Sequence, residues 1–154
     1  MASTAALAPP EVLAKKPAAR VLTEALGDRV LEIADDRGDL SITVARSAWL
    51  EAARLLKSHP ELDYKLFLDL CGADYLDRED RPERFEVVLH LYSVSHKHHV
   101  RLKTPVPESD PKLPTLTGVY KGASWFEREA WDLYGIVFEG HPNLVRILTH
   151  ESFV

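Results

Sequence analysis

The sequence contains a single cysteine, Cys71, among its 154 residues. One thiol cannot form an internal disulfide, and it cannot supply the four thiolates that an iron–sulfur cluster normally requires. We therefore expect no such cluster in this chain, and a reducing, cytosolic setting. Asp69 and Asp74 lie close to the cysteine in sequence. Negative neighbours raise the pKa of a thiol, so we do not expect Cys71 to act as a nucleophile.

Long uncharged runs are absent as well. The longest stretches without Asp, Glu, Lys or Arg are residues 1–10 and 87–96, whereas a membrane-spanning helix needs about 18 apolar residues or more. We expect no membrane span. Acidic residues outnumber basic ones by 24 to 19, which gives a net charge of -5. This charge excludes nonspecific binding to a nucleic-acid backbone.

The sequence also lacks the motifs of nucleotide binding and nucleophilic catalysis. Its seven glycines never form a Gly-x-Gly-x-x-Gly string. Gly135 and Gly140 have the outer spacing of a P-loop, but His141 stands where that loop needs a lysine. Ser124 is not followed by the glycine of a nucleophile elbow. Nucleotide binding therefore belongs to other chains of any complex.

Histidines are concentrated at His96, His98 and His99. Neighbouring residues of a strand point to opposite faces, so His98 and His99 are not expected to bind one ion. The sequence predicts a polar loop between two strands here, and no metal site.

Hydrophobic periodicity predicts an α+β domain. Helices are expected over 18–26 and 47–57, and strands over 30–34, 40–44, 64–70, 85–94 and 99–103. The order helix, two strands, helix, three strands predicts a two-layer fold with a mixed sheet, followed by a C-terminal helix and an extended segment. We divide the chain into a flexible tail rich in Ala and Pro, residues 1–19, and one domain, residues 20–154.

The C-terminal helix is expected over 125–134. Ser124 and Glu127 have the spacing of a capping box, and Gly135 is placed to end the helix. Arg128 is spaced to pair with Asp132 on a charged face. A short extended run at 136–138 should follow, and then a bend at Gly-His-Pro.

The same segment carries a family resemblance. Residues 125–135 read WFEREAWDLYG, residues 136–142 read IVFEGHP, and residues 146–149 read RILT. Together they resemble the hallmark segment of the C subunit of NADH-quinone oxidoreductase, the 30 kDa subunit family of respiratory complex I. The likeness continues upstream through 69–75, 84–92 and 105–107, and it covers 21–149. Val145 departs from the pattern, which has a basic residue or proline there.

The resemblance implies a cofactor-free peripheral-arm subunit of a proton-translocating NADH-quinone oxidoreductase, on the cytoplasmic side of the inner membrane. FMN and iron–sulfur clusters are expected on partner subunits. This chain is expected to dock to the neighbouring D subunit, which helps to build the quinone site, and to have no catalytic residues or activity of its own. We call this neighbour the quinone-site subunit.

The resemblance also places the docking surface on the C-terminal helix and the turn after it. Members of the family usually continue past this point with a second Gly-His-Pro and a charged tail. The residues expected to dock are Glu127, Arg128, Glu129, Trp131, Asp132, Tyr134, Gly140, His141, Pro142 and Arg146.

Other interpretations remain open at this point. The chain could be the equivalent subunit of a related membrane-bound hydrogenase or photosynthetic-type dehydrogenase complex. It could also be a small soluble enzyme that uses His141 and the carboxylates around Glu127 as acid and base. His141 could carry protons near a quinone, although the adjacent Gly and Pro favour a structural turn. Trp125, Trp131 and Tyr134 could be core residues or anchors for a partner.

Overall fold

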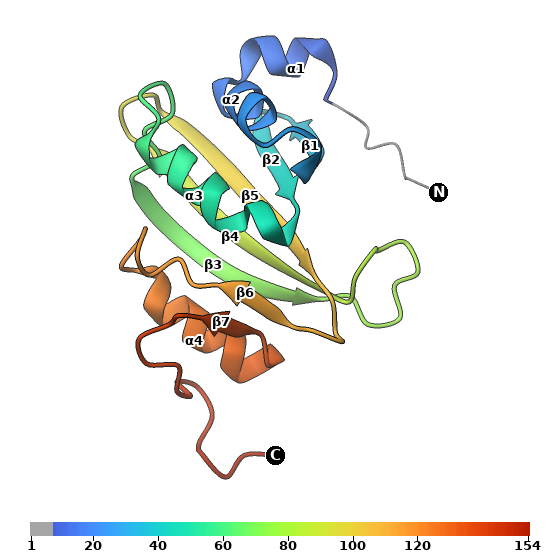
Figure 1. Ribbon diagram of the computed structural model, residues 1–154, viewed down its shortest axis with the longest axis vertical. Helices are drawn as coiled ribbons and strands as arrows, with labels where there is room; N and C mark the ends of the chain where they lie inside the picture. The colour runs from blue at the N-terminus through green and yellow to red at the C-terminus, as the bar shows by residue number, and fades with distance from the viewer. Residues whose placement is uncertain (1–7) are drawn as a thin grey trace.

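The computed structural model describes residues 8–154, in which five strands form one mixed sheet (Figure 1). The strand order across the sheet is β1-β2-β5-β4-β3. Adjacent strands run antiparallel, except that β2 and β5 are parallel. The expected α+β fold is confirmed. The strands span Val30–Asp36 (β1), Asp39–Val44 (β2), Leu66–Asp74 (β3), Phe85–Ser93 (β4) and His98–Val106 (β5).

Two helices, α2 (Pro17–Leu26) and α3 (Trp49–Ser58), cover one face of this sheet (Figure 1). Along β5, Val100 and Leu102 are fully buried, whereas the residues between and beside them are partly exposed. This alternation is the period of two that a sheet with one covered face requires. Trp49 of α3 is also fully buried. None of the helices within residues 8–154 has the length and apolar character needed to cross a bilayer.

The N-terminal part of the chain differs from the expected tail. Helix α1 (Pro10–Lys15) precedes α2, and Pro17 stands in the first turn of α2, a position that suits proline. Ala18 and Ala19 are buried in the core, with 1% and 0% of their surface exposed. A flexible tail reaching to residue 19 is therefore wrong for residues 17–19, and the packed domain begins before residue 20. Residues 1–7 of the expected tail lie outside the described part of the chain.

A second, smaller unit lies along β3 at one end of the molecule (Figure 1). It consists of β6 (Lys112–Pro114), α4 (Ala123–Tyr134) and β7 (Val137–Glu139). The short strands β6 and β7 pair in parallel, a pairing that the sequence did not predict.

Close packing joins α4 to β3. A Cβ atom at Gly72 would lie 2.6 Å from a ring carbon of Tyr134, so β3 approaches the helix at a residue without a side chain. Phe67 of β3 packs against Phe126 of α4, with ring centroids 5.3 Å apart. These contacts fix the position of α4 relative to the sheet.

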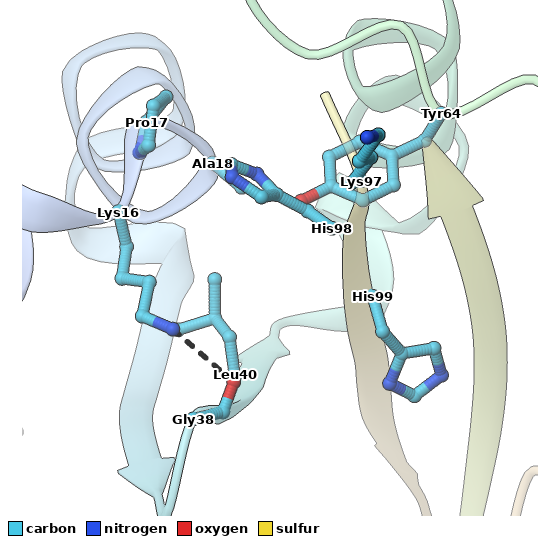
Figure 2. Close-up of a pocket in the computed structure, with 9 residues that line it drawn as sticks. All are labelled: Lys16, Pro17, Ala18, Gly38, Leu40, Tyr64, Lys97, His98 and His99. Carbon is cyan, nitrogen blue, oxygen red and sulfur yellow. Dashed lines mark hydrogen bonds between the residues drawn. The ribbon is translucent and has the colours of Figure 1, made fainter. Parts of the chain in front are cut away.

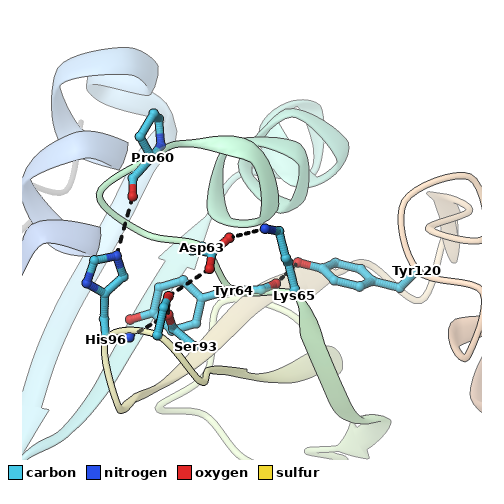
Figure 3. A network of polar contacts seen from close by, with 8 residues as sticks. Pro60, Asp63, Tyr64, Lys65, Ser93, His96 and Tyr120 are labelled. Carbon is cyan, nitrogen blue, oxygen red and sulfur yellow. Dashed lines mark hydrogen bonds and ion pairs between the residues drawn. The ribbon is translucent and has the colours of Figure 1, made fainter.

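A polar network holds the segment before β3 in place (Figure 3). The hydroxyl of Tyr120 donates to the backbone oxygen of Tyr64 at 2.7 Å. The carboxylate of Asp63 pairs with Lys65 at 2.6 Å and accepts a hydrogen bond from the hydroxyl of Ser95 at 2.7 Å. The network therefore joins the β4–β5 turn and the segment before α4 to the start of β3.

Candidate functional site

The structure brings the predicted docking residues together but does not place them on one free surface. All ten lie on α4 or in the C-terminal segment after it, which runs back beside the helix (Figure 1). Gly140 and Pro142 are exposed, Glu127 is fully buried, and the other seven are half-buried.

Glu127 does not form the predicted capping box. The helix begins at Ala123, and its first turn has no side-chain cap. The two carboxylate oxygens of Glu127 accept hydrogen bonds from the Thr115 hydroxyl at 2.5 Å and from the Leu116 backbone N–H at 2.6 Å. Burial raises the pKa of Glu127 to about 7, although these two hydrogen bonds act to lower it. Glu127 therefore fastens the 115–116 loop to α4, and it is not accessible to a substrate or a partner.

Arg128 is turned toward the C-terminal segment. Its Nε donates to the backbone oxygen of Val145 and its Nη2 to that of Arg146, both at 2.9 Å. The guanidinium also lies over the ring of Trp125, 5.2 Å from a ring centroid. The predicted pair with Asp132 is wrong, because the guanidinium is used by these backbone oxygens.

Asp132 binds the same segment one helical turn further along. One of its carboxylate oxygens accepts hydrogen bonds from the backbone N–H groups of Ile147, Leu148 and Thr149, at 3.2, 2.8 and 2.9 Å. The other oxygen contacts the Thr149 hydroxyl. The hydrogen bond from the Thr149 side chain has the largest effect on Asp132, and the backbone N–H groups of the strap act in the same direction. Together they hold the pKa of Asp132 well below its usual range. We call residues 145–149 the C-terminal strap, since Arg128 and Asp132 bind it to α4.

His141 has partners on both ring nitrogens. Nδ1 accepts a hydrogen bond from the Asn143 backbone N–H at 2.9 Å, and Nε2 lies 3.0 Å from the backbone oxygen of Ser124. The second contact requires a hydrogen on Nε2. Through these two contacts the ring joins the turn to the start of α4. Gly140 has φ 84°, which suits a glycine at this bend. This geometry supports the structural turn.

Four large apolar side chains of α4 and the strap stay exposed. Trp125 and Leu148 are each 61% exposed, Leu133 is 49% exposed, and Val145 is 44% exposed. We call these four residues the apolar surface. Helical periodicity predicts Leu133 on the buried side of the helix, and no pattern places Val145 or Leu148 on a docking surface, so these three were missed. Their exposure depends on where the strap lies, which no local pattern encodes.

Two aromatic residues of the predicted set behave differently. Tyr134 is partly buried and packs on Phe85, with ring centroids 6.3 Å apart, and over Gly72. It is therefore part of the contact between α4 and the sheet and not a free anchor. Trp131 is half-buried.

The histidine-rich segment follows the expected strand geometry. His99 stacks on His90 of β4, whereas His98 lies next to His96, and in Figure 2 the rings of His98 and His99 project in different directions from β5. His98 borders a small cavity of about 180 Å³, where Lys16 donates a hydrogen bond to the backbone oxygen of Gly38 at 3.1 Å. Burial lowers the pKa of His98, and the nearby positive groups act in the same direction. The side chains of His98 and His99 thus point apart, as the alternation of a strand predicts.

Comparisons with known proteins agree on the family. Residues 42–154 match the family model described as respiratory-chain NADH dehydrogenase, 30 Kd subunit. The chain is 42% identical over 133 residues to the C subunit of NADH-quinone oxidoreductase from Leptothrix cholodnii. The aligned region covers 84% of this chain and 67% of the relative. It is 45% identical over 148 residues to the subunit of that name from Roseiflexus castenholzii. That aligned region covers 96% of this chain and 80% of the relative.

Solved structures show the same fold. A trypsin-resistant fragment of Nqo5 superimposes with a TM-score of 0.69 at 38% identity, over 81% of this chain and 97% of that one. A chain of an archaeal membrane-bound sulfane sulfur reductase has a TM-score of 0.65 at 24% identity, over 83% and 71% of the two chains, and shows the fold alone. The chain belongs to the 30 kDa subunit family of respiratory-chain NADH dehydrogenase, the family of the NADH-quinone oxidoreductase C subunit.

Proposed function

We propose that this chain is a cofactor-free, non-catalytic subunit of the peripheral arm of a proton-translocating NADH-quinone oxidoreductase. It supports electron transfer from NADH, through FMN and iron–sulfur centres on other subunits, to quinone. It does so by docking to the quinone-site subunit, on the cytoplasmic side of the inner membrane. Family membership supports this proposal, as does the single cysteine, which cannot ligate an iron–sulfur cluster alone.

The observation that carries the docking proposal is the apolar surface beside the strap. Large apolar side chains that stay exposed next to one another mark interaction sites, and tryptophan is enriched among the residues that contribute most to binding. The Arg128 guanidinium over the Trp125 ring restricts that side chain before a partner arrives. Less conformational freedom is then lost on binding.

The structure divides the residues around the strap into two roles. Trp125, Leu133 and Leu148 supply contact area, because much of their surface is free. Arg128 and Asp132 act through the strap, because their polar atoms are occupied by its backbone. The strap in turn holds Leu148 beside α4. Docking therefore depends on the hydrogen bonds of α4 as well as on its exposed side chains.

Co-purification of the quinone-site subunit with this chain tests the proposal. Trp125→Ala and Leu148→Ala should each weaken binding of that subunit by about tenfold or more, the effect of removing a central apolar side chain. Leu76→Ala is the matched control, because Leu76 is 57% exposed but lies in the β3–β4 loop, and it should leave binding unchanged. Full binding of the quinone-site subunit by both Trp125→Ala and Leu148→Ala would contradict the proposal.

A further inference from the structure

The face of the sheet opposite α2 and α3 carries three metal-ligating side chains on two neighbouring strands. Asp69 and Cys71 lie two residues apart on β3, and His90 of β4 is the direct partner of Asp69 in the register. Residues two apart in a strand share a face, and cross-strand partners lie side by side. One ligand atom from each of the three residues lies within 4.8 Å of the other two.

A bulge in β3 creates this arrangement. The register against β4 shifts between Phe67 and Asp69. A bulge adds one residue to a strand and redirects the side chains beyond it. Here it places Asp69 opposite His90, and Cys71, two residues further along, on the same face. The backbone ladder thus holds all three side chains in position.

A fourth residue, His99, orients the imidazole of His90. Nδ1 of His90 lies 3.4 Å from Nε2 of His99 on β5, and the two rings are stacked with centroids 5.4 Å apart. Metal-bound histidines usually donate their second ring N–H to an acceptor, which fixes the tautomer and the ring. His99 can be this acceptor for His90, so that the other ring nitrogen of His90 is free for a cation.

We propose that Asp69, Cys71 and His90 bind a divalent cation of the zinc class, with the fourth position open to water and His99 as a positioning residue. A thiolate and an imidazole favour zinc over magnesium or calcium, which prefer all-oxygen sites. The thiolate and the carboxylate together balance a charge of two. This proposal departs from the sequence-based expectation of no metal site. It also limits the proposed cofactor-free character of the chain to flavin and iron–sulfur clusters.

The distances suit a small adjustment on binding. Bonds of about 2.0–2.3 Å to a tetrahedral zinc place ligand atoms about 3.3–3.8 Å apart. The present separations of up to 4.8 Å need to close by about 1 Å, which side-chain rotation supplies. All three side chains are half-buried, so a cation can reach them from solvent.

Nearby basic residues on the same face have partners of their own. Lys103 lies 3.5 Å from a carboxylate oxygen of Glu86, and Arg101 lies 3.8 Å from one of Asp39. Glu129 of α4 adds negative charge near Cys71. The electrostatic surroundings of the cluster are therefore not dominated by positive charge.

Cobalt(II) titration of the reduced, untagged full chain tests the site. Because Cys71 is the one thiol of the sequence, any thiolate-to-cobalt charge-transfer band reports on this residue. We expect one equivalent of cobalt with the visible bands of tetrahedral coordination, and displacement by zinc. Cys71→Ser should abolish the charge-transfer band. Asp69→Asn and His90→Gln should weaken binding by about tenfold or more.

Matched variants separate ligation from positioning and from adventitious binding. His99→Leu should weaken cobalt binding by about 10- to 100-fold, whereas His99→Gln, whose amide oxygen can still accept the His90 N–H, should retain most of it. His98→Gln, a histidine outside the cluster, should have no effect. Thermal melts verify that each variant is folded. A wild-type chain without the charge-transfer band, or a band that survives Cys71→Ser, overturns the proposal, and neither result bears on docking to the quinone-site subunit.

Discussion

The carboxylate of Asp132 accepts a hydrogen bond from the backbone N–H of Leu148 at 2.8 Å. The same oxygen binds the two N–H groups on either side, so one side chain of α4 holds three consecutive residues of the strap. Backbone N–H groups in an irregular segment otherwise depend on water. Asp132 is therefore the main determinant of where Leu148 lies.

Replacing Asp132 with Ala should loosen the strap without unfolding the domain. Amide hydrogen exchange at residues 147–149 should accelerate by about tenfold or more, because local opening no longer breaks three hydrogen bonds to a carboxylate. Exchange in β4 and β5 should not change. Glu129→Ala, on the same helix, serves as the control. Protection of 147–149 that is the same in both variants would contradict this role of Asp132.

Sequence periodicity was sufficient for the main sheet. Residues 85–94 were expected as a strand, and β4 spans Phe85–Ser93. Continuous apolar character identifies a central strand without knowledge of its neighbours. The N-terminal boundary was wrong because alanine and proline suit a mobile tail and the start of a packed helix equally well.

The site was harder to predict, because its contacts are distant in sequence. Glu127 has the spacing of a capping box, but its partners lie at residues 115 and 116. Asp69 and His90 are adjacent only because a bulge sets the register between two strands. Local patterns specify helices and strands, whereas these pairings depend on how the elements pack.

Glu127 should make stability depend on pH near neutrality. Its pKa is raised from 4.5 to about 7 in the folded chain. Between these values the folded state keeps a proton that the unfolded state has released, so the free energy of unfolding falls as pH rises. The total loss is about 3 kcal/mol, complete above about pH 7 and absent below about pH 4.5.

Urea unfolding of the wild type and of Glu127→Gln between about pH 4 and pH 8 measures this effect. The Gln variant should lose the fall in stability, because it has no carboxylic acid proton to release. The lowered pKa values of His90 and His98 act in both proteins and in the opposite direction, so the difference between wild type and Glu127→Gln isolates the contribution of Glu127. Glu129→Gln should keep the fall in stability. The lowered pKa of Asp132 contributes only below the ordinary value of 3.8, outside this window. A fall in stability with rising pH that is equally large in Glu127→Gln would assign the titration to another group.

Gly72→Ala should destabilise the contact between β3 and α4. The new Cβ would lie 2.6 Å from a ring carbon of Tyr134, so the helix or the ring must move. Overpacking of this kind lowers the free energy of unfolding by about 1–3 kcal/mol. Gly118→Ala is the control, since a Cβ atom there would have no neighbour within 4 Å, and the change should stay within about 0.5 kcal/mol. Equal melting temperatures for the two variants would show that the ring relaxes freely.

Arg128 and Trp125 should affect docking by different routes. Both guanidinium hydrogen bonds of Arg128 go to the strap, whereas the Trp125 side chain is 61% exposed. Arg128→Ala should therefore weaken binding of the quinone-site subunit and also accelerate amide exchange in residues 145–149. Trp125→Ala should weaken binding by about tenfold or more with much less change in exchange, because the ring makes no backbone hydrogen bond to the strap.

Variants of Arg128, made alone and together with Trp125→Ala, decide between an indirect and a direct role for Arg128. If Arg128 acts by positioning the strap, Arg128→Lys should preserve part of the protection and a matching part of the affinity, because a lysine ammonium reaches one backbone oxygen but not both in the same geometry. Affinity and protection should then change together across the Arg128 variants, with and without Trp125→Ala. Affinity that falls in Arg128→Ala while the strap stays fully protected would instead mean that the guanidinium contacts the partner directly.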